Sequence, residues 1–120
     1  MRISLIGSGR VATHLARVLK QQHEIVQVYS RHLEHAAKLA NQCGAKAVSE
    51  YQQLNAEVDL VIIAVSDQVI SSVIVQLSSV LKNVLICKTC FNIICRVDNC
   101  HTGNCSHKSN ILTALMAGTV

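Results

Sequence analysis

A short apolar run leads directly into two glycines near the start of the chain, and this arrangement limits the folds that the chain can adopt. Residues 3–6 are Ile-Ser-Leu-Ile, and Gly7, Ser8 and Gly9 follow them. From Arg10 onward, apolar residues recur at helical spacing. Glycines are needed between a strand and a helix only where the chain turns tightly or where another group approaches the backbone.

The alternation of strand and helix continues along the chain. The apolar run at residues 58–65 is the strongest strand pattern, and its continuous hydrophobicity predicts burial on both faces. We expect Gly44 to end a helix, Ser49 to cap a helical turn, and Ser66 or Asp67 to cap the last helix. The expected strands are 3–6, 24–29, 45–48, 58–65 and 83–87, and the expected helices are 10–22, 33–43 and 69–81, with the turn at 49–54.

This order predicts an α/β fold with a doubly wound, Rossmann-type parallel sheet and helices on both faces. The sheet is expected to be incomplete at its C-terminal end. We divide the chain into a dinucleotide-binding domain at residues 1–87 and a cysteine-rich tail at 88–120, to which the pattern assigns no structure.

The glycines match the pattern G-x-G-x-x-A, which binds dinucleotides when it joins a first strand to a first helix. Gly7 would allow the tight turn, Gly9 would let a pyrophosphate approach the main chain, and Ala12 would let the helix pack close to the sheet. A plain structural turn is the alternative. The candidate cofactor-binding residues of this loop are Gly7, Ser8, Gly9, Arg10 and Val11.

The end of the second strand indicates which dinucleotide would bind. NAD sites usually carry an acid there, bonded to the ribose 2′-hydroxyl, whereas this chain has Ser30, Arg31 and His32. Ser30 and Arg31 could hold a 2′-phosphate, so we predict NADP over NAD. Glu34 lies just beyond, on the next helix. The alternative is that Arg31 is an ordinary solvated loop residue.

Ala64, Val65 and Ser66 follow the fourth strand and should lie beside the pyrophosphate and the nicotinamide ribose. Asp67 is interpreted as a helix cap rather than a catalytic acid, because the helical pattern starts directly after it.

Three segments, ISLIGSGRVATHLARVL, VYSR and DLVIIAVSDQVI, resemble the NADP-binding domain of the pyrroline-carboxylate-reductase-like and deazaflavin-dependent NADP-oxidoreductase-like group. The resemblance covers about residues 2–86. It implies a phosphate loop at residues 7–11, a 2′-phosphate clamp at Ser30 and Arg31, and a nicotinamide-side loop at 64–66. It also implies hydride transfer in intact relatives. Those relatives continue into a helical domain that builds the substrate site, and nothing after Ile86 resembles it, so no catalytic residue can be placed.

Five of the six cysteines fall in one short stretch near the end of the chain: Cys87, Cys90, Cys95, Cys100 and Cys105. Three interpretations stay open: a frameshifted or truncated gene, a loosely folded natural tail, and a metal-binding tail whose spacing matches no zinc finger. We expect no metal site there. A small-molecule substrate would need a supplied substrate domain, and the exposed sheet edge could support a homodimer.

Other function classes receive little support. The net charge of +4 is spread along the chain, and the aromatic residues are few, so we expect no nucleic-acid binding. No apolar run approaches the length of a membrane span, and the start lacks a signal-peptide pattern. We therefore expect a cytoplasmic protein without membrane contact. A regulatory, dinucleotide-sensing module without catalysis remains the rival to an oxidoreductase domain.

Overall fold

The computed structural model describes residues 2–81, 85–88 and 93–96 and shows a six-stranded sheet. The strand order is β3-β2-β1-β4-β5-β6, and neighbouring strands from β3 to β5 run parallel. The last strand, β6, pairs antiparallel with β5. The strands are β1 (Arg2–Ile6), β2 (Glu24–Tyr29), β3 (Lys46–Val48), β4 (Leu60–Ile63), β5 (Leu85–Lys88) and β6 (Ile93–Arg96).

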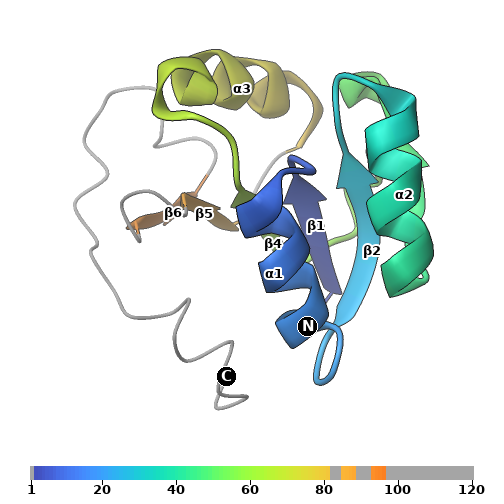
Figure 1. Ribbon diagram of the computed structural model, residues 1–120. Helices are drawn as coiled ribbons and strands as arrows, with labels where there is room; N and C mark the ends of the chain where they lie inside the picture. The colour runs from blue at the N-terminus through green and yellow to red at the C-terminus, as the bar shows by residue number, and fades with distance from the viewer. Residues whose placement is uncertain (1, 82–84, 89–92, 97–120) are drawn as a thin grey trace.

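Helices cover both faces of the sheet, as the alternating pattern predicts. Helices α1 (Arg10–Leu19) and α2 (Leu33–Cys43) lie side by side (Figure 1) and bury their apolar residues in one hydrophobic cluster with Leu5 and Ile62. Helix α3 (Asp67–Val80) and the short 3-10 helix η1 (Tyr51–Gln53) pack on a second cluster with Ile6 and Ile63. Neighbouring residues of β1 and β4 therefore contribute to opposite layers, and the predicted doubly wound fold is confirmed.

Several observed element bounds differ from the expected ones, and β4, for example, spans Leu60–Ile63 rather than 58–65. Helix α1 ends at Leu19 rather than at residue 22, and the His23 amide bonds the Leu19 carbonyl at 2.8 Å to close the turn into β2. Ser49 does not cap the following turn, because η1 begins after Glu50 and has no side-chain cap. Asp67 is the first residue of α3 rather than its cap, and Ser66 holds the cap position without a side-chain hydrogen bond.

The sequence pattern assigned no strand after residue 87, so β6 was missed. Its register pairs Leu85 with Arg96 and Lys88 with Ile93, which places β6 along the outer edge of β5. A segment this short has no recognisable strand pattern of its own, and the partner strand decides its conformation. The other tail residues, including most of its cysteines, lie outside the described residues.

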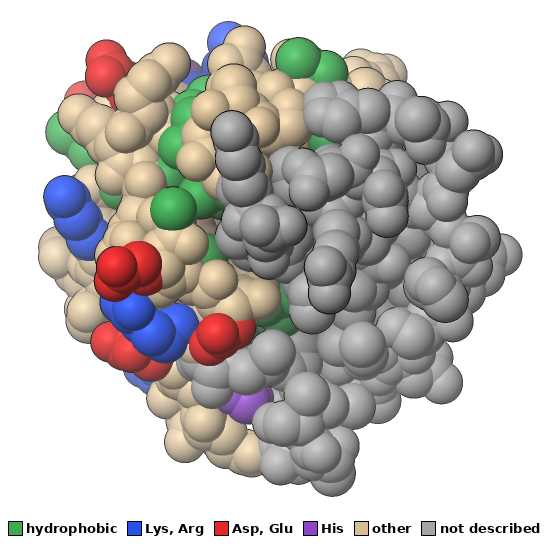
Figure 2. Space-filling view, turned by 180° about the vertical axis from the view of Figure 1, so that it is seen from behind, with side chains coloured by type: hydrophobic (Ala, Val, Ile, Leu, Met, Phe, Trp, Pro, Cys, Tyr) green, Lys and Arg blue, Asp and Glu red, His purple; other side chains and the backbone are tan. Residues whose placement is uncertain are grey.

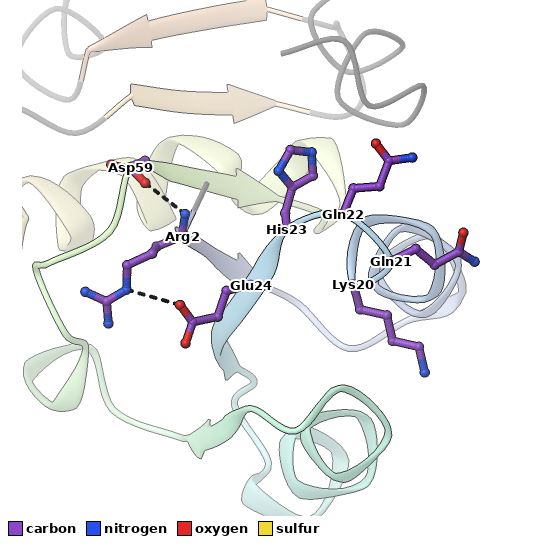
Figure 3. A pocket seen from close by; sticks show the side chains of 7 residues that line it. All are labelled: Arg2, Lys20, Gln21, Gln22, His23, Glu24 and Asp59. Carbon is purple, nitrogen blue, oxygen red and sulfur yellow. Dashed lines mark hydrogen bonds and ion pairs between the residues drawn. The ribbon is translucent and has the colours of Figure 1, made fainter.

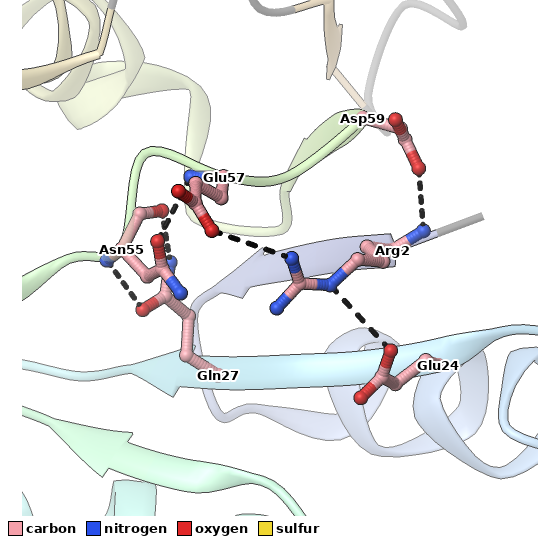
Figure 4. A network of polar contacts seen from close by, with 6 residues as sticks. All are labelled: Arg2, Glu24, Gln27, Asn55, Glu57 and Asp59. Atoms are coloured by element: carbon pink, nitrogen blue, oxygen red, sulfur yellow. Dashed lines mark hydrogen bonds and ion pairs between the residues drawn. The ribbon is translucent and has the colours of Figure 1, made fainter.

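A buried glutamine ties the central strands to the loop before β4 (Figure 4). The register between β1 and β2 shifts after Ile3, which pairs with Ile25, whereas Ser4 pairs with Gln27. The Gln27 side chain is buried, and its Nε2 donates to Ser4 Oγ at 3.0 Å and to the Asn55 carbonyl at 3.1 Å. The Asn55 amide donates to Gln27 Oε1 at 2.8 Å. The Gln27 side chain thereby satisfies the backbone N–H and C=O groups of Asn55, as a neighbouring strand would in a sheet.

Replacing Gln27 with Leu should lower the free energy of unfolding by about 2–3 kcal/mol, because Ser4 and the Asn55 backbone lose their buried partners. Chemical unfolding followed by circular dichroism would measure the change. The exposed variant Gln52→Leu is the control and should change stability by less than about 0.5 kcal/mol. Equal stability of the two variants would show that water replaces the glutamine at no cost.

Candidate functional site

The carboxyl ends of β1, β2 and β4 meet at one edge of the sheet, where a pocket of about 600 Å³ opens. The Gly7 amide donates to the Tyr29 carbonyl, and the Ala64 amide donates to the Ile6 carbonyl, both at 2.8 Å. These bonds extend the sheet pairing by one residue past each strand. They hold the three loops that leave the strands at fixed spacing. Ligands of doubly wound sheets bind in this position.

The pocket brings together most of the cofactor-binding residues expected from the sequence. The expected residues that line it are Gly7, Ser8, Gly9, Ser30, Arg31, Ala64 and Val65. Arg10, Val11 and Ser66 do not line it. Arg10 and Val11 occupy the first turn of α1 with exposed side chains, and Ser66 is exposed at the start of α3.

The structure gives the two glycines of the loop different roles. Gly7 has a φ of +118°, and a side chain there would collide with the Ala64 carbonyl oxygen. Gly9 has a φ of −77°, which any residue can adopt, and a Cβ built on it meets nothing within 4 Å. Gly7 is therefore required by the fold. Neither backbone conformation nor packing requires Gly9, and the open space beside it is room for an incoming group.

The start of α1 presents unpaired backbone donors at this open space. Gly9 is the N-cap residue and provides no side-chain cap, and the first turn has no acidic residue. The first helical bond is the one from the Thr13 amide to the Gly9 carbonyl, at 2.9 Å. The amides before Thr13 therefore have no partner within the helix, and the positive end of the helix dipole lies there too. Such a terminus attracts anionic groups.

A hydrogen bond joins the glycine loop to the end of β2. Ser8 Oγ donates to Ser30 Oγ at 3.1 Å, and the Ser30 amide donates to the Val48 carbonyl at 3.1 Å. Ser30 is 9% exposed, whereas Arg31, the next residue, is exposed to solvent. The residues expected to distinguish NADP from NAD therefore lie directly beside the glycine loop.

Two stacked tyrosines and one face of α3 complete the pocket, and sequence reasoning did not find them. The rings of Tyr29 and Tyr51 are 4.3 Å apart and inclined by 21°. Val69 and Val73 of α3 add apolar surface. Burial raises the pKa of the Tyr51 hydroxyl above its ordinary value, the Tyr29 hydroxyl raises it further, and Arg31 opposes the rise. The sequence offered one tyrosine at the end of the expected strand 24–29 and another in the expected turn 49–54, and nothing in their spacing shows that they meet.

The opposite end of the sheet has a different character. Its hollow, about 450 Å³ in volume, is lined by Arg2, Lys20, Gln21, Gln22, His23, Glu24 and Asp59 (Figure 3). Arg2 forms ion pairs with Glu24 at 3.5 Å and Glu57 at 3.9 Å, and its amide bonds Asp59 Oδ2 at 2.8 Å. Acidic and basic side chains lie next to one another on this part of the surface (Figure 2). These exposed contacts link the starts of β1 and β2 to the loop before β4. Because the opposite charges offset one another, this end of the sheet has little attraction for a charged ligand.

Among the residues that the structure describes, no group of three or more His, Cys, Asp or Glu side chains could hold a metal ion. Cys43 is half-buried on α2, and burial raises the pKa of its thiol. No helix in the described part of the chain is long and apolar enough to cross a membrane.

The model of the family described as NADP oxidoreductase, coenzyme F420-dependent, matches residues 2–89, which include every strand and loop that builds the pocket. The chain belongs to this family. The predicted resemblance and the predicted NADP-oxidoreductase-type domain are thereby confirmed. Membership in the family implies a nicotinamide dinucleotide as the cofactor. Comparison with curated protein sequences finds no match.

Solved structures support the assignment of the domain. A Bacteroides fragilis protein described as an NADP oxidoreductase is 30% identical, with a TM-score of 0.69 over 72% of this chain and 35% of its own. UDP-N-acetylglucosamine 3-dehydrogenase of Acidithiobacillus ferrooxidans is 24% identical, with a TM-score of 0.64 over 73% of this chain and 29% of its own. Biliverdin reductase of Synechocystis, solved with biliverdin and NADP+, is 22% identical, with a TM-score of 0.61 over 72% of this chain and 28% of its own. The chain therefore spans about a third of the length of these proteins, and the two more distant ones share its fold.

The different roles of the glycines lead to different effects of substitution. Gly7→Ala should lower the free energy of unfolding by about 2–4 kcal/mol, because it adds backbone strain and a collision with Ala64. Gly9→Ala is the matched control and should stay within about 1 kcal/mol of the wild type. Urea unfolding of both variants would compare them. A Gly9 variant as unstable as the Gly7 variant would contradict the structural distinction.

The raised pKa of Tyr51 makes stability depend on pH in the alkaline range. The folded state favours the protonated phenol, whereas tyrosine in the unfolded chain ionises near about pH 10. Stability should therefore fall as the pH rises above this value. Tyr51→Phe should lose less stability than the wild type between about pH 9 and 11, as measured by urea midpoints. Parallel curves for the two proteins would show that Tyr51 ionises normally.

Proposed function

We propose that this chain binds NADP in the pocket at the carboxyl ends of β1, β2 and β4 and presents its nicotinamide for hydride transfer. The observation that carries the choice of NADP is the end of β2, where Ser30 and Arg31 stand beside the phosphate loop. Among the side chains that the structure describes, no acidic one lines the pocket. A carboxylate there would repel a 2′-phosphate, whereas a serine hydroxyl and an arginine can bind it.

The phosphate loop would hold the pyrophosphate. Gly9 leaves space against the main chain, and the uncapped amides at the start of α1 can donate to phosphate oxygens. Ser8 is held by Ser30, so the loop and the clamp form one surface. These features fit the anionic half of the cofactor.

Ala64, Val65 and Ser66 follow β4 and would lie toward the nicotinamide end, where small and apolar residues leave a face of the ring accessible. The cofactor supplies the hydride chemistry, and the protein positions it. The substrate is a small molecule whose binding groups lie outside the residues placed here. A dinucleotide-sensing module is less well supported, because such sensors more often bind NAD through an acid at the end of the second strand.

Arg31→Ala should weaken NADPH binding by about 1–3 kcal/mol, because a charge-assisted contact to the 2′-phosphate is lost. NADH binding should change little. Titration followed by cofactor fluorescence would measure both affinities on the full chain.

Gly9→Val provides the reference for this experiment. Its side chain would occupy the space proposed for the pyrophosphate, so it should abolish binding of both cofactors while circular dichroism shows a retained fold. Equal loss of NADPH and NADH affinity in Arg31→Ala would contradict the clamp, and unchanged affinity in Gly9→Val would contradict the phosphate loop.

A further inference from the structure

A second depression lies beside the cofactor pocket, between α1 and α2. Its volume is about 540 Å³, and its lining includes Ser8, Gly9, Thr13, Arg17, His35 and Lys38. Its walls come from α1, which carries Thr13 and Arg17, and from α2, which carries His35 and Lys38. Lys20, the C-cap residue of α1, donates from Nζ to the Gln42 carbonyl at the end of α2 at 3.0 Å, and Gln42 also lines the depression. We call this depression the α1–α2 groove.

The α1–α2 groove is positively charged. Arg17 approaches it from α1, and Lys38 and His35 approach it from α2, whereas none of the described residues that line it is acidic. Within the described residues, no hydrogen bond or ion pair engages the side chain of Arg17 or Lys38, and the His35 ring contacts only that of His32. Basic groups gathered in a concave surface without counter-charges create a potential that attracts anions. This differs from the opposite end of the sheet, where Arg2 is paired with acids.

The groove is continuous with the proposed cofactor pocket. Ser8 and Gly9 line both, and Ser8 is hydrogen-bonded to Ser30 at the end of β2. A group bound beside Ser30 and Arg31 would therefore stand at the mouth of the groove. A phosphate monoester carries close to two negative charges near neutral pH, more than Arg31 alone can balance.

We propose that Arg17 and Lys38 determine cofactor specificity together with Arg31, by attracting and holding the 2′-phosphate of NADP at the mouth of the α1–α2 groove. This inference rests on the proposed function, since it concerns the same cofactor. Arg31 reaches the phosphate from the loop after β2, and the two helices supply the positive charge on its other side. The exposed position of both side chains makes their contribution salt-dependent.

The test uses the full chain with Arg17→Gln, Lys38→Gln and the double variant. Each single variant should raise the Kd for NADPH about 3- to 10-fold, and the double variant should raise it further, with NADH changed by less than about 2-fold. Lys46→Gln is the charge-matched control, because Lys46 is exposed on β3 and lines none of these pockets. Competition by 2′,5′-ADP should weaken in the same variants, while competition by 5′-ADP should not.

The outcomes separate the two proposals. Unchanged NADPH affinity in the double variant, with Arg31→Ala still selective, overturns the role of the groove and leaves the proposed function standing. Equal loss for NADPH and NADH also overturns it, since the groove would then act on the whole cofactor. Inorganic phosphate that binds through Arg17 and Lys38 without changing the ratio of NADPH to NADH affinity would assign the groove to a separate anion and overturn the proposal. A wild-type chain that binds neither cofactor overturns both.

Discussion

The close approach of Gly7 to the Ala64 carbonyl is the contact on which the site depends. It occurs at the end of β1, the central strand that lies between β2 and β4. Gly7 has a φ of +118° at this point. Because Gly7 has no side chain, the loop after β1 can turn directly over the end of β4 and start α1 beside the strand ends. The open helix terminus, the Ser8–Ser30 hydrogen bond and the pocket are all consequences of this turn.

The distribution of charge separates the two ends of the sheet. At the amino ends, Arg2 is bound by acids from β2 and from the loop before β4, and this cluster joins three chain segments. At the carboxyl ends, the pockets that Arg31, Arg17 and Lys38 line contain no acidic side chain from the described part of the chain. An anionic ligand would find its counter-charges at the same edge as the free amides of α1, where the strand order also leaves a crevice.

The family assignment and the local features agree with one another. The family model matches residues 2–89, and the pocket is built from the loops after β1, β2 and β4 within that range. The family implies a nicotinamide dinucleotide as the cofactor. The match covers only about a third of each of the compared structures. A shared dinucleotide-binding fold hosts many activities, so the fold by itself does not select a substrate.

The sequence by itself determined the order of strands and helices, the glycine loop and the basic end of β2, because these depend on local spacing and on residue type. The glycine pattern predicted a turn at Gly7 and free space at Gly9, whereas only the tertiary structure showed that the Ala64 carbonyl is the group that would collide with a side chain at Gly7. It also brought Tyr51 against Tyr29 and placed Arg17 and Lys38 on one groove. It paired β6 with β5, which no local pattern indicated. Contacts between residues far apart in the chain are set by how the helices cross the sheet, and local propensity carries no information about them.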